Sequence, residues 1–395
     1  MSLYPESVLV GPLDELVVGS GIHAAIYVSN RDRPPAVVER NSRVGGAFAE
    51  ADKPVFYLNS RNRPFTENGI TGPGTEGPLN YIPGGILQPS DVNCMEYQTQ
   101  SVLAAVVRDN LVAKAVVFID SPLEAVFEEG NNLKVVIASK EYSVQRVLLA
   151  TGLGNPLIPF RLGPTSARVW SFPEFVRIVG SVNNSFSPQD FGRVAVIGSG
   201  DGGKVVMEHL MGQGPSDPGV FLDKVDWYGQ DARNCEEFTK RERSRYAGLG
   251  RNFPNGDRSF RIRPINARVL SVESAGGRAL VRCLLAGEPT PGIYDTVIYC
   301  CGFGPPDIPL PPYEERLVRE KGEPIATKLV GCEVYKMGPC AGLSVDYREK
   351  RNNPLLDKVP QNTAAIFRYA GKTAALARRL PSGAVGNVSD EGGPM

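Results

Sequence analysis

The sequence predicts an α/β fold built from two copies of one unit, in which an apolar strand turns at glycines into a helix and a second strand follows. In the first copy, the strand Leu16–Val18 leads into Gly19-Ser20-Gly21, a helix expected over Ile22–Ser29 and a strand at Ala36–Val38. The second copy begins with the strand Arg193–Ile197. Such repeats are typical of parallel sheets covered by helices, so we expect two related domains within the 395 residues.

The first glycine turn has the composition of a nucleotide-binding turn. Gly19 and Gly21 let the backbone turn tightly and approach a pyrophosphate, and Ala24 lets the helix pack closely on the strand. The helix N-terminus offers N–H groups to phosphates, and Glu39 follows Gly19 by 20 residues, the distance at which a carboxylate meets an adenosine ribose. The alternative is an ordinary strand–helix–strand unit with a glycine turn. The residues expected to bind the nucleotide here are Gly19, Ser20, Gly21, His23, Ala24, Glu39 and Arg40.

The next segment, Arg43–Phe48, resembles the R-x-G-G-x-F/W segment of flavin-dependent monooxygenases and their relatives with two dinucleotide-binding domains. In that family a glycine pair lets the chain wrap around the pyrophosphate and ribityl side of the flavin. The resemblance implies FAD as the first cofactor, with Gly46, Ala47 and Phe48 beside it.

A second resemblance lies at Ala150–Pro159, which resembles the A-T-G-x-x-x-x-P-x-I-P pattern that closes the first FAD half-domain in flavin monooxygenases, with one residue fewer between the glycine and the first proline. A buried strand ends there at a glycine that passes close to the cofactor, and prolines begin an extended crossover. The resemblance implies cofactor contacts from Thr151 and Gly152, and a backbone contact from Val126 to the adenine.

The second copy carries a complete G-x-G-x-x-G at Gly198–Gly203, followed by a helix to Leu210 and a strand at Val225–Tyr228. The resemblance implies that this copy receives NADPH or NADH; the alternative is a degenerate unit that binds nothing. No acid follows the strand directly, which favours NADP, although Asp231 leaves NAD open. The implied binding residues are Gly198, Ser199, Gly200, Asp201, Gly203, Gln230 and Arg233.

Two later segments resemble family motifs with substitutions. Tyr294–Phe303 matches D-x-V-I-x-A-T-G-Y with Cys300-Cys301 in place of Ala-Thr, and Val334–Gly342 matches the final flavin motif with Pro339 in place of an aspartate. Gly302 and Gly338 are expected beside the cofactors. Trp170 stands where these monooxygenases usually carry a histidine, which counts against a Baeyer–Villiger or typical flavin-containing monooxygenase and leaves amine N-hydroxylases and reductases less affected.

Residues 51–91 show no long periodic segment and are rich in Asn, Gly and Pro. Since long irregular segments in compact proteins are usually functional or disordered, we expect a loop that lines the substrate pocket, with a solvated excursion as the alternative. Its polar candidates are Asn59, Arg61 and Asn80, and Leu79-Asn80-Tyr81 resembles the F-L-N-Y-L segment of siderophore-type amine N-hydroxylases.

Composition narrows the function classes. The 43 basic and 43 acidic residues cancel, so no global field attracts nucleic acid or an anionic membrane. No apolar run reaches the roughly 18–20 residues of a membrane span, and the N-terminus lacks a signal-peptide pattern, so we expect a cytoplasmic protein. The seven cysteines include no C-x-x-C, and only two histidines exist. A metal site and a histidine-centred triad are therefore disfavoured, and the chemistry is better assigned to a cofactor.

These observations predict two Rossmann-like domains, the NAD(P)H domain (166–289) being inserted into an FAD domain (1–165 and 290–380), with a flexible tail (381–395). The predicted function is an NAD(P)H-dependent FAD monooxygenase that uses O₂ to hydroxylate a small organic substrate, such as an amine, through a flavin C4a-hydroperoxide. The alternatives are an FAD-dependent NAD(P)H reductase without oxygen insertion and a non-catalytic flavin-binding redox module. Further helices are expected over Asp91–Arg108 and Thr363–Arg379.

Overall fold

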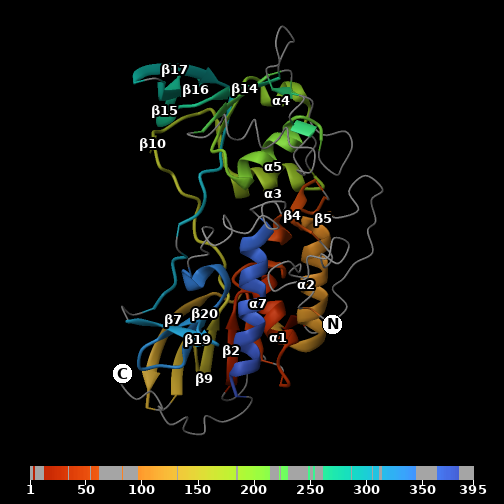
Figure 1. The fold of residues 1–395 in the computed structure, drawn as a ribbon, viewed down its shortest axis with the longest axis vertical. Coiled ribbons are helices and arrows are strands. Elements are labelled where there is room, and N and C mark those ends of the chain that lie inside the picture. Colours follow the sequence, from red (N-terminus) through yellow and green to blue (C-terminus); the bar gives the residue numbers. More distant parts are fainter. Residues whose placement is uncertain are drawn as a thin grey trace.

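The computed structural model describes residues 3–4, 13–33, 35–53, 55–61, 82, 97–130, 132–183, 186–213, 222, 224–229, 248–249, 252–253, 261–285, 287–304, 306–310, 314–343 and 363–381. These residues form two units that lie one above the other in Figure 1. The first unit, below, holds the elements from both ends of the chain, and the second unit, above, holds the middle elements.

The first unit is built on a ten-stranded sheet with the order β1-β6-β3-β2-β9-β21-β20-β19, in which β8 also pairs with β9 and β7 with β8. The strands from β1 to β21 in this order are parallel, and the remaining pairs are antiparallel. Their bounds are β1 Leu3–Tyr4, β2 Leu13–Val18, β3 Ala36–Val38, β6 Val116–Phe118, β7 Leu123–Glu129, β8 Asn132–Ile137, β9 Lys140–Leu149, β19 Glu315–Glu320, β20 Glu323–Leu329 and β21 Val334–Lys336.

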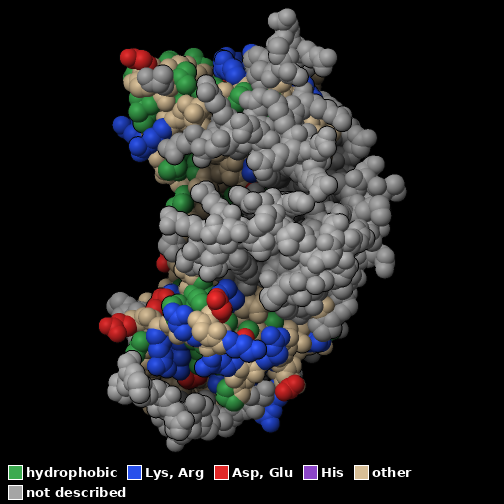
Figure 2. Space-filling view, viewed as in Figure 1, with side chains coloured by type: hydrophobic (Ala, Val, Ile, Leu, Met, Phe, Trp, Pro, Cys, Tyr) green, Lys and Arg blue, Asp and Glu red, His purple; other side chains and the backbone are tan. Residues whose placement is uncertain are grey.

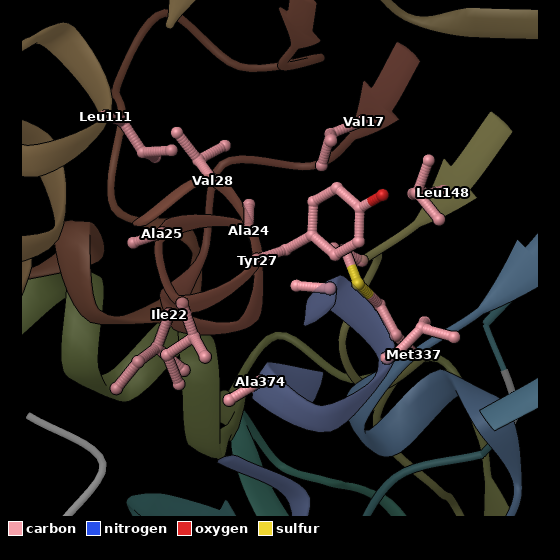
Figure 3. Packing of buried hydrophobic residues seen from close by; sticks show 14 of the residues in the cluster. Val17, Ile22, Ala24, Ala25, Tyr27, Val28, Leu111, Leu148, Met337 and Ala374 are labelled. Atoms are coloured by element: carbon pink, nitrogen blue, oxygen red, sulfur yellow. The ribbon is translucent and has the colours of Figure 1, made fainter. Parts of the chain in front are cut away.

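Side chains along the central strands point alternately to the two faces of this sheet, and helices cover one of these faces. Val17 of β2 and Leu148 of β9 pack against α1 (Ile22–Ser29), α2 (Gln100–Lys114) and α7 (Thr363–Arg379), as Figure 3 shows for Tyr27 of α1 and Ala374 of α7. Their neighbours in β2 and β9 point to the opposite face, where the β7–β8 ribbon covers them. Both faces of the central strands are thus buried, as in other parallel sheets.

A buried ionic network fixes the end of α7 on the sheet. Glu15 accepts hydrogen bonds from Arg31 Nη2 at 2.6 Å and from Arg146 Nη1 at 2.7 Å. Arg31 also donates to the carbonyl of Ala377 at 2.8 Å, and both arginines donate to the carbonyl of Pro381. The charges are paired inside the fold, and the guanidinium groups satisfy carbonyls that a helix C-terminus leaves without partners.

The second unit is built on a five-stranded parallel sheet with the order β11-β18-β12-β13-β14. Its strands are β11 Arg168–Ser171, β12 Val194–Ile197, β13 Val225–Tyr228, β14 Ile262–Ile265 and β18 Thr296–Tyr299. The helices α3 (Phe172–Gly180) and α5 (Asp201–Leu210) cover one face, with the short α4 (Pro188–Phe191) nearby. A four-stranded sheet covers the other face and consists of β10 Arg161–Leu162, β15 Arg268–Ala275, β16 Arg278–Leu285 and β17 Glu288–Tyr294.

Two extended linkers join the units and pair with each other. Gly154 donates to the carbonyl of Gly304 at 3.0 Å, Gly304 donates to Asn155 at 2.9 Å, and Leu157 donates to Gly302 at 3.0 Å. The crossover predicted after Gly152 is therefore one half of a paired connection, and the return path forms the other half.

A segment of the first unit also enters the core of the second. Ala51, Val55 and Phe56 belong to the apolar cluster beneath α3 and α5. The rings of Phe56, Phe175 and His209 contact one another in a triangle, with centroid separations of 6.0 Å (Phe56–Phe175), 5.4 Å (Phe56–His209) and 5.7 Å (Phe175–His209). This segment follows the η2 turn (Gly46–Glu50) and precedes β4 (Tyr57–Arg61), which pairs with β5 (Tyr97–Thr99). The chain that follows Arg43–Phe48 thereby packs the first unit against the second.

The closest point of this contact is at the end of α3. The backbone N–H groups of Asp52 and Lys53 both donate to the carbonyl of Gly180 at 2.9 Å. A Cβ atom at Gly180 would lie 2.9 Å from the Cα atom of Ala51. Only a glycine allows this approach, so the relative placement of the two units depends on it.

Several predictions are confirmed and others need correction. The helices at Ile22–Ser29 and Thr363–Arg379 have the predicted bounds. The helix expected over Asp91–Arg108 instead spans Gln100–Lys114, because the Thr99 hydroxyl accepts from Val102 N and caps it there. The boundary expected between residues 289 and 290 cuts through β17, and β18 beyond it pairs with β12; the second unit therefore continues to Tyr299.

Figure 2 shows basic side chains gathered on the first unit around the β19–β20 hairpin and the end of α7. Acidic side chains of the same hairpin lie among them, so this surface is mixed in sign. The exposed charged residues are Arg316, Arg319, Lys321, Arg378 and Arg379, with Glu315 and Glu323. In the part of the chain that the structure describes, no helix is long and apolar enough to cross a membrane.

We predict that Gly180→Val destabilises the protein by about 1–3 kcal/mol, because the new side chain overlaps the backbone of Ala51. Gly163→Ala is the matched control, since a Cβ atom there meets ordinary contacts at 3.5 Å and beyond. Urea unfolding of both variants measures the difference. Equal stability of the two variants would contradict a tight contact between the units.

Candidate dinucleotide-binding sites

The first glycine turn, Gly19–Gly21, sits at the carboxyl ends of three parallel strands. Gly19 has a φ of 96° and donates to the carbonyl of Val38 at 2.8 Å, while Ala150 N donates to the carbonyl of Val18 at 2.8 Å. A Cβ atom at Gly19 would lie 2.7 Å from the carbonyl oxygen of Ala150. The turn is thus pressed against the end of the neighbouring strand β9.

The glycine pair of the next segment folds back onto this turn. Gly45 N donates to Ser20 Oγ at 3.2 Å, and Gly46 has a φ of 62°. A Cβ atom at Gly46 would lie 2.8 Å from the Cα atom of Gly21, whereas a Cβ atom at Gly21 would meet nothing closer than 3.8 Å. Gly46 is therefore needed for the fold itself, and Gly21 leaves free space in front of the helix.

The carboxylate of Glu39 is buried beside the turn. Its Oε2 accepts from Ser20 N at 3.0 Å and from Ser20 Oγ at 2.7 Å, and its Oε1 accepts from Asn41 N at 2.9 Å. A carboxylate has about four acceptor positions, so one remains for a further donor such as a ribose hydroxyl. Glu39 is thus fixed beside the glycine turn, and its contact with a ribose stays a prediction.

The two helices that follow glycine turns begin without a side-chain cap. Gly21 and Gly200 occupy the N-cap positions of α1 and α5, whereas Thr99 caps α2 and Ser171 forms a capping box on α3. Uncapped first turns leave N–H groups for an external acceptor, and the helix dipole favours an anion there. Both helices can therefore bind a pyrophosphate.

The second glycine turn, Gly198–Gly200, repeats the geometry of the first. Gly198 has a φ of 108° and donates to the carbonyl of Tyr228 at 2.8 Å, and Cys300 N donates to the carbonyl of Ile197 at 2.6 Å. A Cβ atom at Gly198 would overlap the carbonyl of Cys300. A Cβ atom at Gly200 would meet nothing within 4 Å, so this turn also leaves space in front of its helix.

Tight packing behind the second turn explains its third glycine. A Cβ atom at Gly203 would overlap the carbonyl oxygen of Gly198, which also accepts from Trp227 Nε1 at 2.8 Å. Asp201 lies in the first turn of α5 with its Oδ1 3.7 Å from Lys204 Nζ. The lysine partly offsets an acidic charge at the end of the helix that would face phosphates.

The two turns differ at the residue after the second strand. Val38 and Tyr228 accept the equivalent hydrogen bond, so Gly229 corresponds to Glu39. A Cβ atom at Gly229 would lie 2.7 Å from the side chain of Ser199, which corresponds to Ser20. The acid that pairs with the serine in the first turn is thus replaced by bare backbone in the second.

The late motifs end beside the turns. Gly152 and Gly302, with φ values of 71° and 90°, follow the strand ends that support the two turns, and a Cβ atom at either would meet nothing within 4 Å. The Thr151 hydroxyl oxygen is buried beside the Cys340 thiol, with which it interacts, and that thiol also donates to the carbonyl of Leu149 at 2.9 Å. A cofactor hydroxyl or phosphate near the first turn would give the threonine a further hydrogen bond.

The remaining predicted residues are placed as follows. Arg40 and Ala47 are exposed, Phe48 packs on the helix side of the core, and the side chain of Val126 is buried on the opposite side. Asn59 and Arg61 lie in β4. Asn80, Gln230 and Arg233 lie outside the described residues, and so does most of the predicted pocket loop. Trp170 packs against Phe175 and the neighbouring aromatic rings of the second unit.

The described cysteines do not have the environment of a redox pair. Cys300 is buried, which raises the pKa of its thiol well above the usual value, and burial raises the pKa of the Cys301 thiol to about 11. Since the thiolate is the reactive form, both thiols are unreactive near neutral pH. Among the described residues, no group of three or more His, Cys, Asp or Glu side chains could hold a metal ion.

Comparisons with known proteins show the fold. No protein-family model and no curated protein matches the sequence. A Kutzneria sp. 744 ornithine N-hydroxylase, in a complex with reduced FAD, NADP⁺ and L-ornithine, has 14% identity and a TM-score of 0.57; the match covers 92% of this chain and 99% of that chain. A flavin-containing monooxygenase from Stenotrophomonas maltophilia and the thioredoxin reductase of T. acidophilum each have 16% identity and a TM-score of 0.52, covering 93% of this chain and 98% of theirs. The predicted fold of two Rossmann-like domains is confirmed.

We predict that Gly21→Val abolishes FAD binding and leaves NADP⁺ binding intact, whereas Gly200→Val does the reverse. A Cβ atom at Gly200 would meet nothing within 4 Å and one at Gly21 only an ordinary contact at 3.8 Å, so neither variant should unfold the protein. Equilibrium binding of each nucleotide measures the two effects. Gly21→Val protein that retains FAD at wild-type affinity would contradict the placement of the first site.

We predict that stability falls as the pH is lowered from 6.5 towards about 4. Burial lowers the pKa of His23 and of His209 to about 4, so the unfolded chain binds more protons than the folded chain in this window. The loss is on the order of 3 kcal/mol per histidine. Urea unfolding as a function of pH measures it, and His209→Phe, placed between two phenylalanine rings, should flatten the slope; an unchanged slope would contradict a neutral His209.

Proposed function

We propose that the chain is an NADPH-dependent FAD monooxygenase that hydroxylates a small nucleophilic organic substrate such as an amine. The observation that carries the proposal is that two glycine turns make the same backbone hydrogen bonds and each precedes a helix without a side-chain cap. The first turn has a carboxylate beside it, that of Glu39, and the second has Gly229 at the equivalent position. The neighbouring structures with this fold, flavin monooxygenases and N-hydroxylases among them, support it.

FAD fits the first turn. The free space in front of Gly21, the wrapped Gly45–Gly46 pair and the remaining acceptor position of Glu39 match a pyrophosphate and an adenosine ribose. The buried Thr151 hydroxyl beside the first turn supports the same placement. When bound, FAD would accept a hydride and supply reduced flavin for the reaction with O₂; the protein would hold it, orient it and exclude water.

NADPH fits the second turn better than NADH. An NAD site usually places a carboxylate on the ribose 2′-hydroxyl, and the corresponding Gly229 has no side chain. An acid there would repel the 2′-phosphate of NADPH. Lys204, in the first turns of α5, adds a cation to the same end of the helix.

The thiols favour a monooxygenase over a disulfide reductase. Reduction of a disulfide through the protein would need a reactive cysteine pair, and the only adjacent pair, Cys300-Cys301, has raised thiol pKa values. The two units are packed together through Phe56 and Gly180. This packing also suits hydride transfer from the nicotinamide to the flavin without a rearrangement of the units. Substrate residues are expected in the segment after η2, where Asn59, Arg61 and Asn80 remain candidates.

A flavin reductase or dehydrogenase without oxygen insertion is the second candidate. Trp170 in the position of the family histidine favours it, because the indole is committed to an aromatic cluster rather than to a cofactor. The substitutions Cys301 for threonine and Pro339 for aspartate point in the same direction. A non-catalytic flavin module is the remaining alternative, which bound flavin that NADPH cannot reduce would favour.

The test is anaerobic mixing of FAD-loaded protein with NADPH and, separately, with NADH, while the flavin absorbance is followed. Bleaching that is faster with NADPH supports the cofactor assignment, and flavin that stays oxidised with both would overturn it. Oxygen is then admitted with a panel of small amines. Hydroxylated product supports the monooxygenase, whereas NADPH oxidation that yields only hydrogen peroxide with every amine supports the reductase.

We predict that the double variant Ser199→Gly/Gly229→Asp loses preference for NADPH. Ser199→Gly removes the atoms that an aspartate side chain would overlap, and the new carboxylate repels a 2′-phosphate. Arg233→Ala should likewise weaken NADPH more than NADH, by about 1–3 kcal/mol. Binding of both nucleotides to each variant, with Ser199→Gly as the control, measures the change; equal effects on NADPH and NADH would remove these positions from the site.

A further inference from the structure

His23 lies in the first turn of α1, directly behind the first glycine turn, and its side chain is buried. Its Nδ1 is 3.0 Å from the hydroxyl oxygen of Thr373 on α7, which is 350 residues away in the chain and fully buried. The bond therefore joins the beginning of the first unit to its last helix.

The same imidazole lies against a third segment. Gly338, where β21 passes into η5 (Gly338–Ala341), has a φ of 67°, and a Cβ atom there would lie 2.6 Å from the Cγ and Cδ2 atoms of His23. Met337, the residue before it, donates to the carbonyl of Leu149 at 3.0 Å. The glycine backbone is thus held between the imidazole and the end of β9.

We propose that His23 is a positioning residue for the flavin, which sets the spacing between the α1 N-terminus, the backbone at Gly338 and α7 through its hydrogen bond to Thr373. This inference rests on the proposed FAD site at the first glycine turn. Two of these three segments, the α1 N-terminus and the backbone at Gly338, are ones that the sequence associates with the cofactors.

A packing role alone does not account for the choice of residue. Burying an imidazole costs free energy that an aliphatic side chain of similar volume would not, unless its nitrogen is hydrogen-bonded. The bond to Thr373 supplies that partner and fixes the rotation of the ring. Burial also keeps the imidazole neutral, since it lowers the pKa of His23 to about 4. The polar contact therefore specifies one alignment of α1 on α7.

The experiment measures the FAD dissociation constant of the apoprotein and of four variants. Thr373→Val removes the hydroxyl with little change in shape, and Thr373→Ser keeps the hydroxyl and loses the methyl group. His23→Asn retains a polar atom near the position of Nδ1, and His23→Leu removes it. We expect Thr373→Val and His23→Leu to weaken FAD binding about tenfold, Thr373→Ser and His23→Asn to stay within about threefold, and Thr373→Val to add nothing to His23→Leu.

The opposite pattern, with Thr373→Val binding FAD like wild type and Thr373→Ser binding it weakly, would overturn the inference, because it would show that only the methyl group matters. Urea unfolding of the apoproteins separates loss of the flavin site from loss of the fold. If wild type binds FAD and Gly21→Val does not, while all four variants bind normally, the inference fails and the FAD site stands. If wild type does not bind FAD at all, the proposed function fails.

Discussion

The structure depends on one steric constraint that occurs twice. The first glycine of each turn lies against the carbonyl at the end of a neighbouring strand, Gly19 against Ala150 and Gly198 against Cys300, where a Cβ atom would not fit. Each turn closes the same pair of backbone hydrogen bonds with the strands on either side. Since β9 and β18, which end at these carbonyls, come much later in the chain than the turns, each turn completes its contacts only when a distant strand has paired beside it. Two positive helix ends are thereby directed at open space.

The consequences of this constraint extend from the turns to the junction between the units. The strand ends that support the turns continue through Gly152 and Gly302 into the linkers, which pair with each other. The segment Arg43–Phe48 lies against the first turn, and the chain after it places Phe56 in the core of the second unit. A nucleotide at the first turn would therefore contact the same stretch of chain that holds the second unit in place. This stretch of chain thus connects the first turn to the core of the second unit.

The features that the sequence predicted are those that local backbone preferences determine. The glycine spacing and the apolar runs located both turns, α1, α7 and the crossover, because glycine and β-branched residues have strong local preferences. Long-range contacts were not predictable: the pairing of His23 with Thr373, the contact of Ala51 with Gly180 and the extension of the second unit through β18 join residues far apart in the chain. The edge strand β17 was missed because Pro289 and Pro291 obscure its pattern. The equivalence of Gly229 with Glu39 needed the hydrogen bonds of both turns.

The most direct test of two separate dinucleotide sites is calorimetric titration of NADP⁺ into protein already saturated with FAD. Two independent turns predict that one FAD and one NADP⁺ bind per chain, and that FAD is not displaced. Competition between FAD and NADP⁺ for a single site, or failure of either nucleotide to bind, would contradict the account.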